Sequence, residues 1–95
     1  MTPAEKSHSE ALAKACRVVG SQSALAALLG GKVKQAHVFY WLETGRIPAQ
    51  HCPTIERETA ARGDVVRCEE LNSQADWAVL RRQALESHTP AEHAG

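Results

Sequence analysis

The chain has 95 residues, and its eleven basic and eleven acidic side chains cancel to a net charge of zero. This length suits one small domain with a modest core, and an oligomer would fit that size. A neutral total argues against a nonspecific coat on nucleic acid but not against a site-specific reader, because residues 1–62 carry +3 and residues 63–95 carry −3.

The N-terminal residues and the cysteines indicate which cellular compartment to expect. The first ten residues are polar, and no apolar run approaches the roughly 20 residues of a membrane span, so neither a signal peptide nor a membrane partner is expected. Cys16, Cys52 and Cys68 are an odd number without close pairing. This spacing favours buried thiols in a reducing cytoplasm.

The first predicted element is an amphipathic helix over 7–19. Its apolar residues recur at i, i+3, i+4 and i+7, which places them on one stripe of a helix. Ser7 or Ser9 is expected to cap the start of this helix, and Gly20 is expected to end it as a left-handed residue.

Two further helices follow across a glycine turn. Segment 22–29 is rich in Ala and Leu, the strongest helix formers, and Ser21 precedes it as a good N-cap. Gly30 and Gly31 stop this helix. The next helix is predicted over 34–44, where polar and aromatic side chains alternate around an apolar stripe.

The second half of the chain predicts shorter elements. A helix is expected over about 50–61, with Pro53 tolerated only in its first turn. Residues 65–67 form a short extended piece, and residues 68–71 suit one helical turn. A final helix is predicted over 76–85.

These elements together predict an all-α fold, a bundle of four to five short helices in one domain over residues 7–85. The final helix would bury Trp77 and Leu80. Residues 86–95 are polar and contain a proline, so they are expected to form a disordered tail.

The pair of helices at 22–29 and 34–44 has the pattern of a helix-turn-helix. Alanines let the first helix approach the second, and the glycines allow the turn between them. The second helix must then bury one face and offer the other to a DNA groove.

The helical wheel of segment 34–44 divides its aromatic residues. At about 100° per residue, one sector holds the residues expected to face the core, which are Val38, Trp41 and Leu42. Phe39 and Tyr40 then face outward, where DNA could cover them through thymine methyl groups, bases or phosphates. The alternative is that Phe39 packs on a second subunit or beneath the C-terminal segment.

Two stretches of the sequence resemble a known family. Residues 21–30 and 33–38, with Trp41 and Leu42, look like the helix-turn-helix of phage Cro and CI-type repressors. The later run contains the residues Gly45-Arg46-Ile47-Pro48-Ala49, His51-Cys52-Pro53, Ile55-Glu56, Val66–Leu71 and Asp76-Trp77. This run is similar to the Cro-like, YdaS-type antitoxin regulators of prophages, and the resemblance covers about residues 10–80.

The resemblance implies a lambda-repressor-like DNA-binding domain that is dimeric on a palindromic operator. Gln22 matches a position that contacts the DNA backbone and braces the recognition glutamine. Gln35 matches that glutamine, which can hold adenine through two hydrogen bonds. Ala36, Phe39 and Tyr40 match further positions that face the groove.

One departure from the family pattern concerns the turn at residues 30–34, which is one or two residues longer than usual and contains two lysines. The resemblance therefore does not fix the first residue of the recognition helix. Lys32, Lys34 and Arg46 are expected to contact phosphate, whereas Glu43 opposes it. The full set of expected DNA-binding residues is Gln22, Ser23, Lys32, Lys34, Gln35, Ala36, His37, Phe39, Tyr40 and Arg46.

The sequence gives little support for a metal site or a catalytic site. His51, Cys52 and Cys68 lack the paired spacing of a zinc site, so no metal is expected. Cys52 with His51 and Glu56 could suggest a nucleophile, but no phosphate-binding loop or pocket accompanies them. Neither enzyme activity nor a cofactor is expected.

The sequence therefore predicts a Cro-like repressor in the cytoplasm, associated with the nucleoid, that binds operator DNA as a homodimer. Residues 65–85 are the candidate dimer contact. The competing prediction is a protein-interaction module or antitoxin that binds a partner toxin, with DNA binding secondary.

Overall fold

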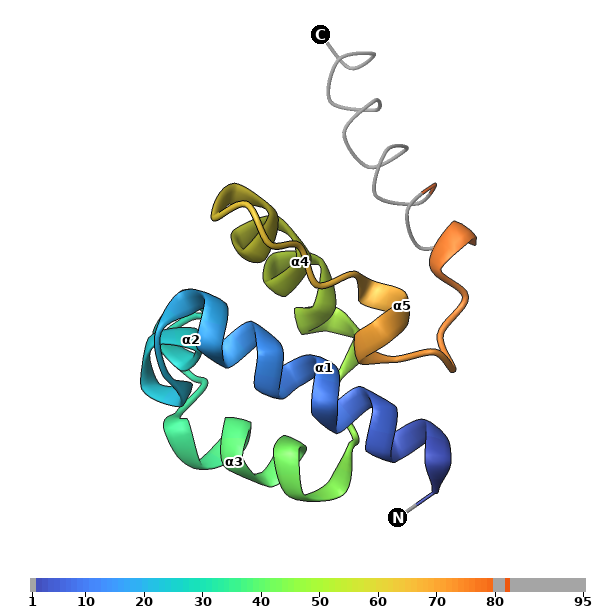
Figure 1. Cartoon of the computed structure of the whole chain (residues 1–95), viewed down its shortest axis with the longest axis horizontal. Coiled ribbons are helices and arrows are strands. Elements are labelled where there is room, and N and C mark those ends of the chain that lie inside the picture. The colour runs from blue at the N-terminus through green and yellow to red at the C-terminus, as the bar shows by residue number, and fades with distance from the viewer. Residues whose placement is uncertain (1, 80–81, 83–95) are drawn as a thin grey trace, which may run out of the picture.

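The computed structural model describes residues 2–79 and residue 82. Over this part of the chain the fold contains helices and connecting segments but no β-strand, which confirms the predicted all-α class (Figure 1). The elements in chain order are α1 (Pro3–Val19), α2 (Gln22–Leu29), α3 (Gln35–Thr44), the 3-10 helix η1 (Ala49–His51), α4 (Cys52–Ala61) and α5 (Cys68–Leu71).

Helix α1 begins earlier than the apolar stripe indicated. The Thr2 hydroxyl accepts a hydrogen bond from the Glu5 backbone N–H at 3.1 Å, and the Glu5 carboxylate accepts one from the Thr2 N–H at 2.9 Å. This capping box satisfies two N–H groups that the first turn leaves unpaired. The expected cap at Ser7 or Ser9 is therefore wrong, and the Ser9 hydroxyl instead donates to the Leu42 carbonyl oxygen at 2.5 Å.

The helix-turn-helix pair lies close to its predicted bounds. Helix α2 spans the predicted residues, and the Ser21 hydroxyl caps it by accepting from the Ala24 N–H at 3.0 Å. Helix α3 begins one residue later than predicted, because Lys34 has extended backbone angles and serves as the N-cap residue. The connection therefore comprises residues 30–34, which agrees with the longer turn read from the sequence.

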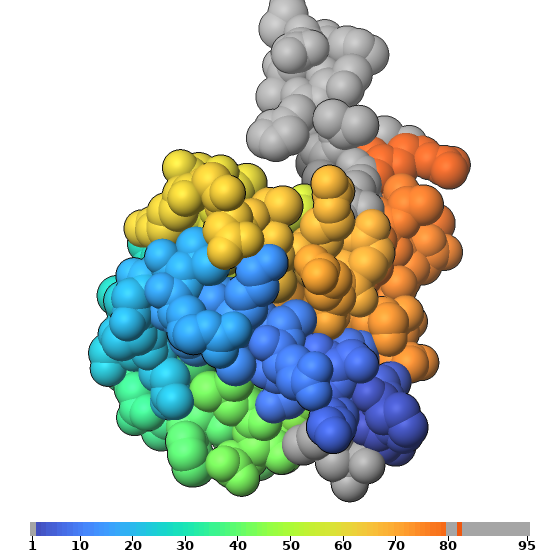
Figure 2. All heavy atoms as spheres, viewed as in Figure 1, coloured from blue at the N-terminus to red at the C-terminus, as the bar shows by residue number. Residues whose placement is uncertain are grey.

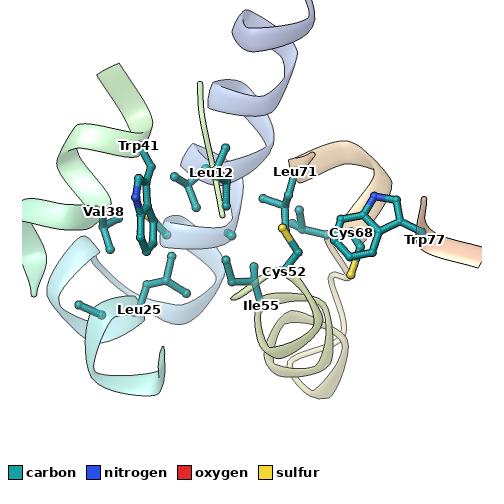
Figure 3. Close-up of a cluster of buried hydrophobic side chains, with 14 residues drawn as sticks. Leu12, Leu25, Val38, Trp41, Cys52, Ile55, Cys68, Leu71 and Trp77 are labelled. Atoms are coloured by element: carbon teal, nitrogen blue, oxygen red, sulfur yellow. The ribbon is translucent and has the colours of Figure 1, made fainter. Parts of the chain in front are cut away.

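The core forms where α1 crosses the other helices. Helix α1 contacts α2, α3, α4 and α5, and in Figure 2 it lies against both α3 and α5. Trp41 and Val38 point from α3 toward Leu12 of α1 and Leu25 of α2 (Figure 3). Burying a large apolar side chain stabilises a fold by about 1.5–3 kcal/mol, so this layer fixes the orientation of α3.

The segment after α4 packs back on the bundle through buried polar contacts. The Thr59 hydroxyl donates to the Ile55 carbonyl oxygen at 2.8 Å and accepts from the Val66 N–H at 2.8 Å. Leu71 and Trp77 are buried beyond it, and the Trp77 indole donates to the Asn72 carbonyl oxygen at 2.6 Å. The single turn α5 and the buried Trp77 agree with the sequence analysis.

Some predictions fall beyond the part of the chain that the structure describes. Leu80 and the tail 86–95 lie outside the described residues, and the domain limits of 7–85 stay a prediction. The final helix begins at Trp77, and its residues through 79 are helical.

Candidate nucleic-acid interface

Helix α3 divides its aromatic side chains between the core and the surface. Val38 is fully buried and Trp41 is 7% exposed, whereas Phe39 is 51% and Tyr40 is 57% exposed. The predicted inner and outer faces of this helix are therefore confirmed. One alternative was that Phe39 packs beneath the C-terminal segment. The described part of that segment does not bury Phe39.

The N-terminal ends of α2 and α3 meet through two glutamines. The Gln35 side-chain nitrogen Nε2 donates to the Gln22 oxygen Oε1 at 2.6 Å, and Gln35 remains exposed. This contact uses one N–H of Gln35, and the second N–H and the Oε1 oxygen of this exposed side chain make no hydrogen bond with the described residues. Those two groups form the donor and acceptor pair that matches the major-groove edge of adenine.

His37 has a structural role that its position on the helix edge did not reveal. Its Nδ1 atom accepts a hydrogen bond from the Lys34 N–H at 2.9 Å, which caps the start of α3 in place of a Ser or Asp. Because Nδ1 is the acceptor, the neutral ring carries its proton on Nε2. His37 is exposed, so this remaining N–H can donate to an outside partner.

Residues 30–33 of the turn line a hollow beside α3, together with His37 and His51. The His51 ring lies over Trp41, with ring centroids 5.4 Å apart. Burial, and secondarily the nearby His37, lower the pKa of His51. A lowered pKa favours the neutral form of His51, so this ring adds little positive charge beside α3.

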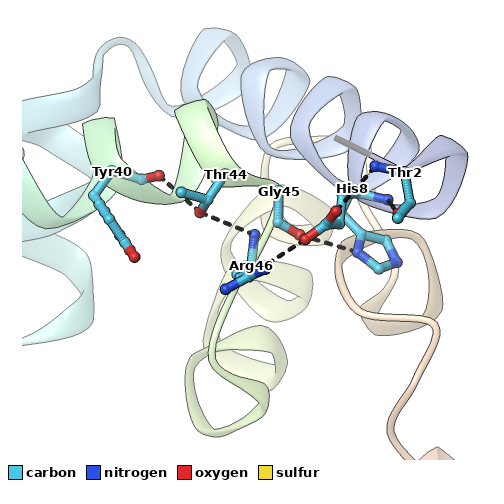
Figure 4. Close-up of polar contacts among 7 residues, drawn as sticks. Thr2, His8, Tyr40, Thr44, Gly45 and Arg46 are labelled. Atoms are coloured by element: carbon cyan, nitrogen blue, oxygen red, sulfur yellow. Dashed lines mark hydrogen bonds and ion pairs between the residues drawn. The ribbon is translucent and has the colours of Figure 1, made fainter.

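Arg46 stands just beyond α3 and has a partner within the chain (Figure 4). Its Nε atom donates to the Glu5 carboxylate at 2.9 Å, while the arginine side chain is 74% exposed. The Thr2 backbone N–H and then the Arg46 guanidinium lower the pKa of Glu5 to about 2. Glu5 is thus ionised near neutral pH and offsets part of the charge that Arg46 was expected to offer a phosphate.

His8 holds the C-terminal end of α3 from inside the molecule. It is 5% exposed, and its Nε2 atom accepts from the Ser73 N–H at 3.0 Å. The proton is then on Nδ1, which donates to the Gly45 carbonyl oxygen at 3.1 Å. His8 precedes Leu12 by four residues and so lies on the buried stripe of α1, which was the one available sequence signal for its role.

The ten expected DNA-binding residues lie at or near the surface. Gln22 is half-buried, and the other nine are exposed: Ser23, Lys32, Lys34, Gln35, Ala36, His37, Phe39, Tyr40 and Arg46. Glu43 is exposed as well, on the outward side of α3. The surface therefore combines an amide pair, apolar side chains and cations near both ends of α3.

The cysteines do not form a reactive centre. Cys16, Cys52 and Cys68 are free and buried, and burial raises the pKa of the Cys52 thiol to about 12. A thiolate is the nucleophilic form, so Cys52 is poorly suited to catalysis. Within residues 2–79 and 82, no three His, Cys, Asp or Glu side chains are grouped so that they could hold a metal ion. Within the described residues, every helix is too short or too polar to cross a membrane.

Comparison with known proteins decides the family. The model of a family described as "Bacterial toxin YdaS" matches residues 12–80. The chain belongs to the YdaS family. A curated protein of Escherichia coli K12 named "Putative transcriptional regulator YdaS" is 51% identical over 72 residues, which cover 75% of this chain and 68% of that relative. No solved structure matches the chain significantly.

The match confirms the expected membership of the YdaS-type family. The two descriptions differ, since the family is described as a toxin and the relative as a transcriptional regulator.

Proposed function

We propose that this chain is a sequence-specific DNA-binding transcriptional regulator, a Cro-like repressor that inserts α3 into the major groove of its operator. The observation that carries the proposal is the outward side of α3. It presents Gln35, braced by Gln22 at 2.6 Å, next to exposed Phe39 and Tyr40. A buried Trp41 on the opposite side fixes this orientation.

Contacts to phosphates and contacts to base edges would have different roles in DNA binding. Phosphate contacts from Lys32, Lys34, Arg46 and the N-terminal end of α2 at Ser23 would set the position of the protein on the duplex. The Nε2–H of His37 is suited to a further phosphate contact. Base edges would be read by Gln35, Ala36, Phe39 and Tyr40.

A regulator of this kind would act as a homodimer in the cytoplasm, on two half-sites separated by roughly one DNA turn of 34 Å. The candidate dimer contact is the segment beyond α4, residues 65–85. Its described part packs on the bundle through Val66, Leu71 and Trp77 and leaves Val79 exposed.

A second function, a module that binds a partner protein in a toxin–antitoxin pair, is favoured by two observations. The chain has no net charge, and Glu43 places an anion on the outward side of α3. Salt separates the two functions, because DNA binding through several phosphate contacts weakens steeply as salt rises.

The test replaces Gln35 with Ala. A duplex enriched from a random pool by the full chain serves as operator, and fluorescence anisotropy measures its affinity beside that of an unrelated duplex. Gln35→Ala is expected to weaken operator binding by about tenfold to a hundredfold, because one bidentate base contact is lost. Affinity for the unrelated duplex should remain.

The control is Ser7→Ala, since Ser7 is an exposed polar residue of α1 that lies outside both the expected DNA-binding residues and the candidate dimer contact. This variant should bind both duplexes as the parent does. If Gln35→Ala binds the operator with parental affinity, the assignment of Gln35 as the recognition residue is wrong.

A further inference from the structure

The outward side of α3 carries a continuous apolar strip, here defined as Ala36, Phe39 and Tyr40. These residues stand at i, i+3 and i+4, so their side chains are neighbours on the helix surface. Phe39 and Tyr40 are more than half exposed. Among the described residues the other exposed large hydrophobic side chain is Val79, which lies beyond α5. The strip is thus a local concentration of apolar surface that a partner would cover.

The charges around the strip are arranged for a polyanion that meets the ends of α3 and not its middle. Helix α3 contains neither Lys nor Arg, and its one acidic residue is Glu43. Lys32 and Lys34 precede the helix and Arg46 follows it, all three exposed. Phosphates that flank a groove would meet these cations while the base edges meet the strip.

The chemistry of the strip restricts which bases it can read. Guanine is most often recognised by a bidentate Arg or Lys, and α3 offers neither. The thymine 5-methyl group is the apolar feature of the major groove, and small or aromatic side chains contact it. At the N-terminal end of the strip, the free groups of Gln35 match adenine.

We propose that Ala36, Phe39 and Tyr40 recognise thymine 5-methyl groups in a half-site rich in A·T pairs, beside the adenine that Gln35 holds. This inference rests on the proposed DNA-binding function and specifies its substrate. Figure 4 shows the Tyr40 ring extending away from α3, while its backbone carbonyl accepts from the Thr44 hydroxyl at 2.9 Å. The helix backbone at the strip is therefore held while the rings remain open to a partner.

The test removes single methyl groups from the DNA. Duplexes enriched from a random pool by the full chain are resynthesised with deoxyuridine in place of thymidine, one position at a time. Uracil keeps the pairing and the O4 acceptor and lacks only the 5-methyl group. At contacted positions, affinity is expected to fall about threefold to tenfold, as the loss of one buried methyl contact predicts.

A protein variant, combined with the deoxyuridine substitution, completes a double-mutant cycle. Phe39→Ala should bind the thymidine duplex more weakly than the parent and should lose the sensitivity to deoxyuridine at the position that Phe39 contacts. Val79→Ala also removes an exposed hydrophobic side chain, and it should retain the parental sensitivity. Circular dichroism melting of both variants checks that each remains folded.

The possible outcomes test thymine-methyl recognition separately from DNA binding. The inference is supported if removal of a methyl group weakens binding by the parent chain but does not weaken binding by Phe39→Ala. Enriched duplexes that bind equally well with deoxyuridine overturn it while leaving DNA binding intact. Failure to enrich any duplex overturns the proposed function itself.

Discussion

Replacing Gly45 with Ala is expected to lower the free energy of unfolding by about 3 kcal/mol or more, since a positive backbone angle and steric overlap act together. Gly45 ends α3 with a φ of +69°, a region that residues with a Cβ rarely occupy. A Cβ at this position would overlap the Glu5 backbone carbonyl group of α1. The substitution must therefore separate α1 from the end of α3.

Gly63→Ala is the matched control for this prediction. Gly63 has a φ of +82°, but a Cβ there would meet nothing within 4 Å. Only the backbone cost remains, which is about 1–2 kcal/mol. Urea denaturation of both variants measures the difference, and equal losses would contradict the close approach of α1 to Gly45.

Trp41→Ala is expected to reduce the free energy of unfolding by about 3–5 kcal/mol, the usual cost of truncating a buried aromatic side chain. Trp41 fills the space between α3, α1 and α2, and its ring centroid lies 5.4 Å from that of His51. Loss of this packing should leave α3 without a fixed orientation. DNA binding should therefore weaken together with stability.

Phe39→Ala serves as the control two residues earlier on the same helix. Phe39 is half exposed, so its truncation should change the free energy of unfolding by no more than about 0.5 kcal/mol. Thermal melting and urea denaturation of the two variants provide the comparison. A larger loss for Phe39→Ala than for Trp41→Ala would reverse the assigned faces of α3.

The sequence predicted the parts of the fold that depend on local pattern. Helix α2 has the predicted bounds because Ser21 and the glycines are strong local signals on either side of an Ala-rich run. Trp41 lies inside because the wheel of α3 leaves one apolar sector. The contact between Gln35 and Gln22 was implied by family resemblance, and the structure shows it at 2.6 Å.

The parts that the sequence did not predict depend on partners distant along the chain or on unusual caps. Glu5 and Arg46 are separated by 41 positions, and no local pattern pairs them. His8 reaches Gly45 and Ser73 only after α1 has packed against both. The start of α1 was missed because its apolar stripe begins later than the capping box at Thr2 and Glu5.

In the proposed function, the outward side of α3 is the surface that meets DNA. Titration of an enriched duplex into the ¹⁵N-labelled full chain, followed by amide chemical shifts, tests this placement. The largest changes are expected at Gln22, at residues 32–40 and at Arg46, with small changes in α5. Changes confined to α1 and α5, with the amides of α3 unmoved, would contradict the claim.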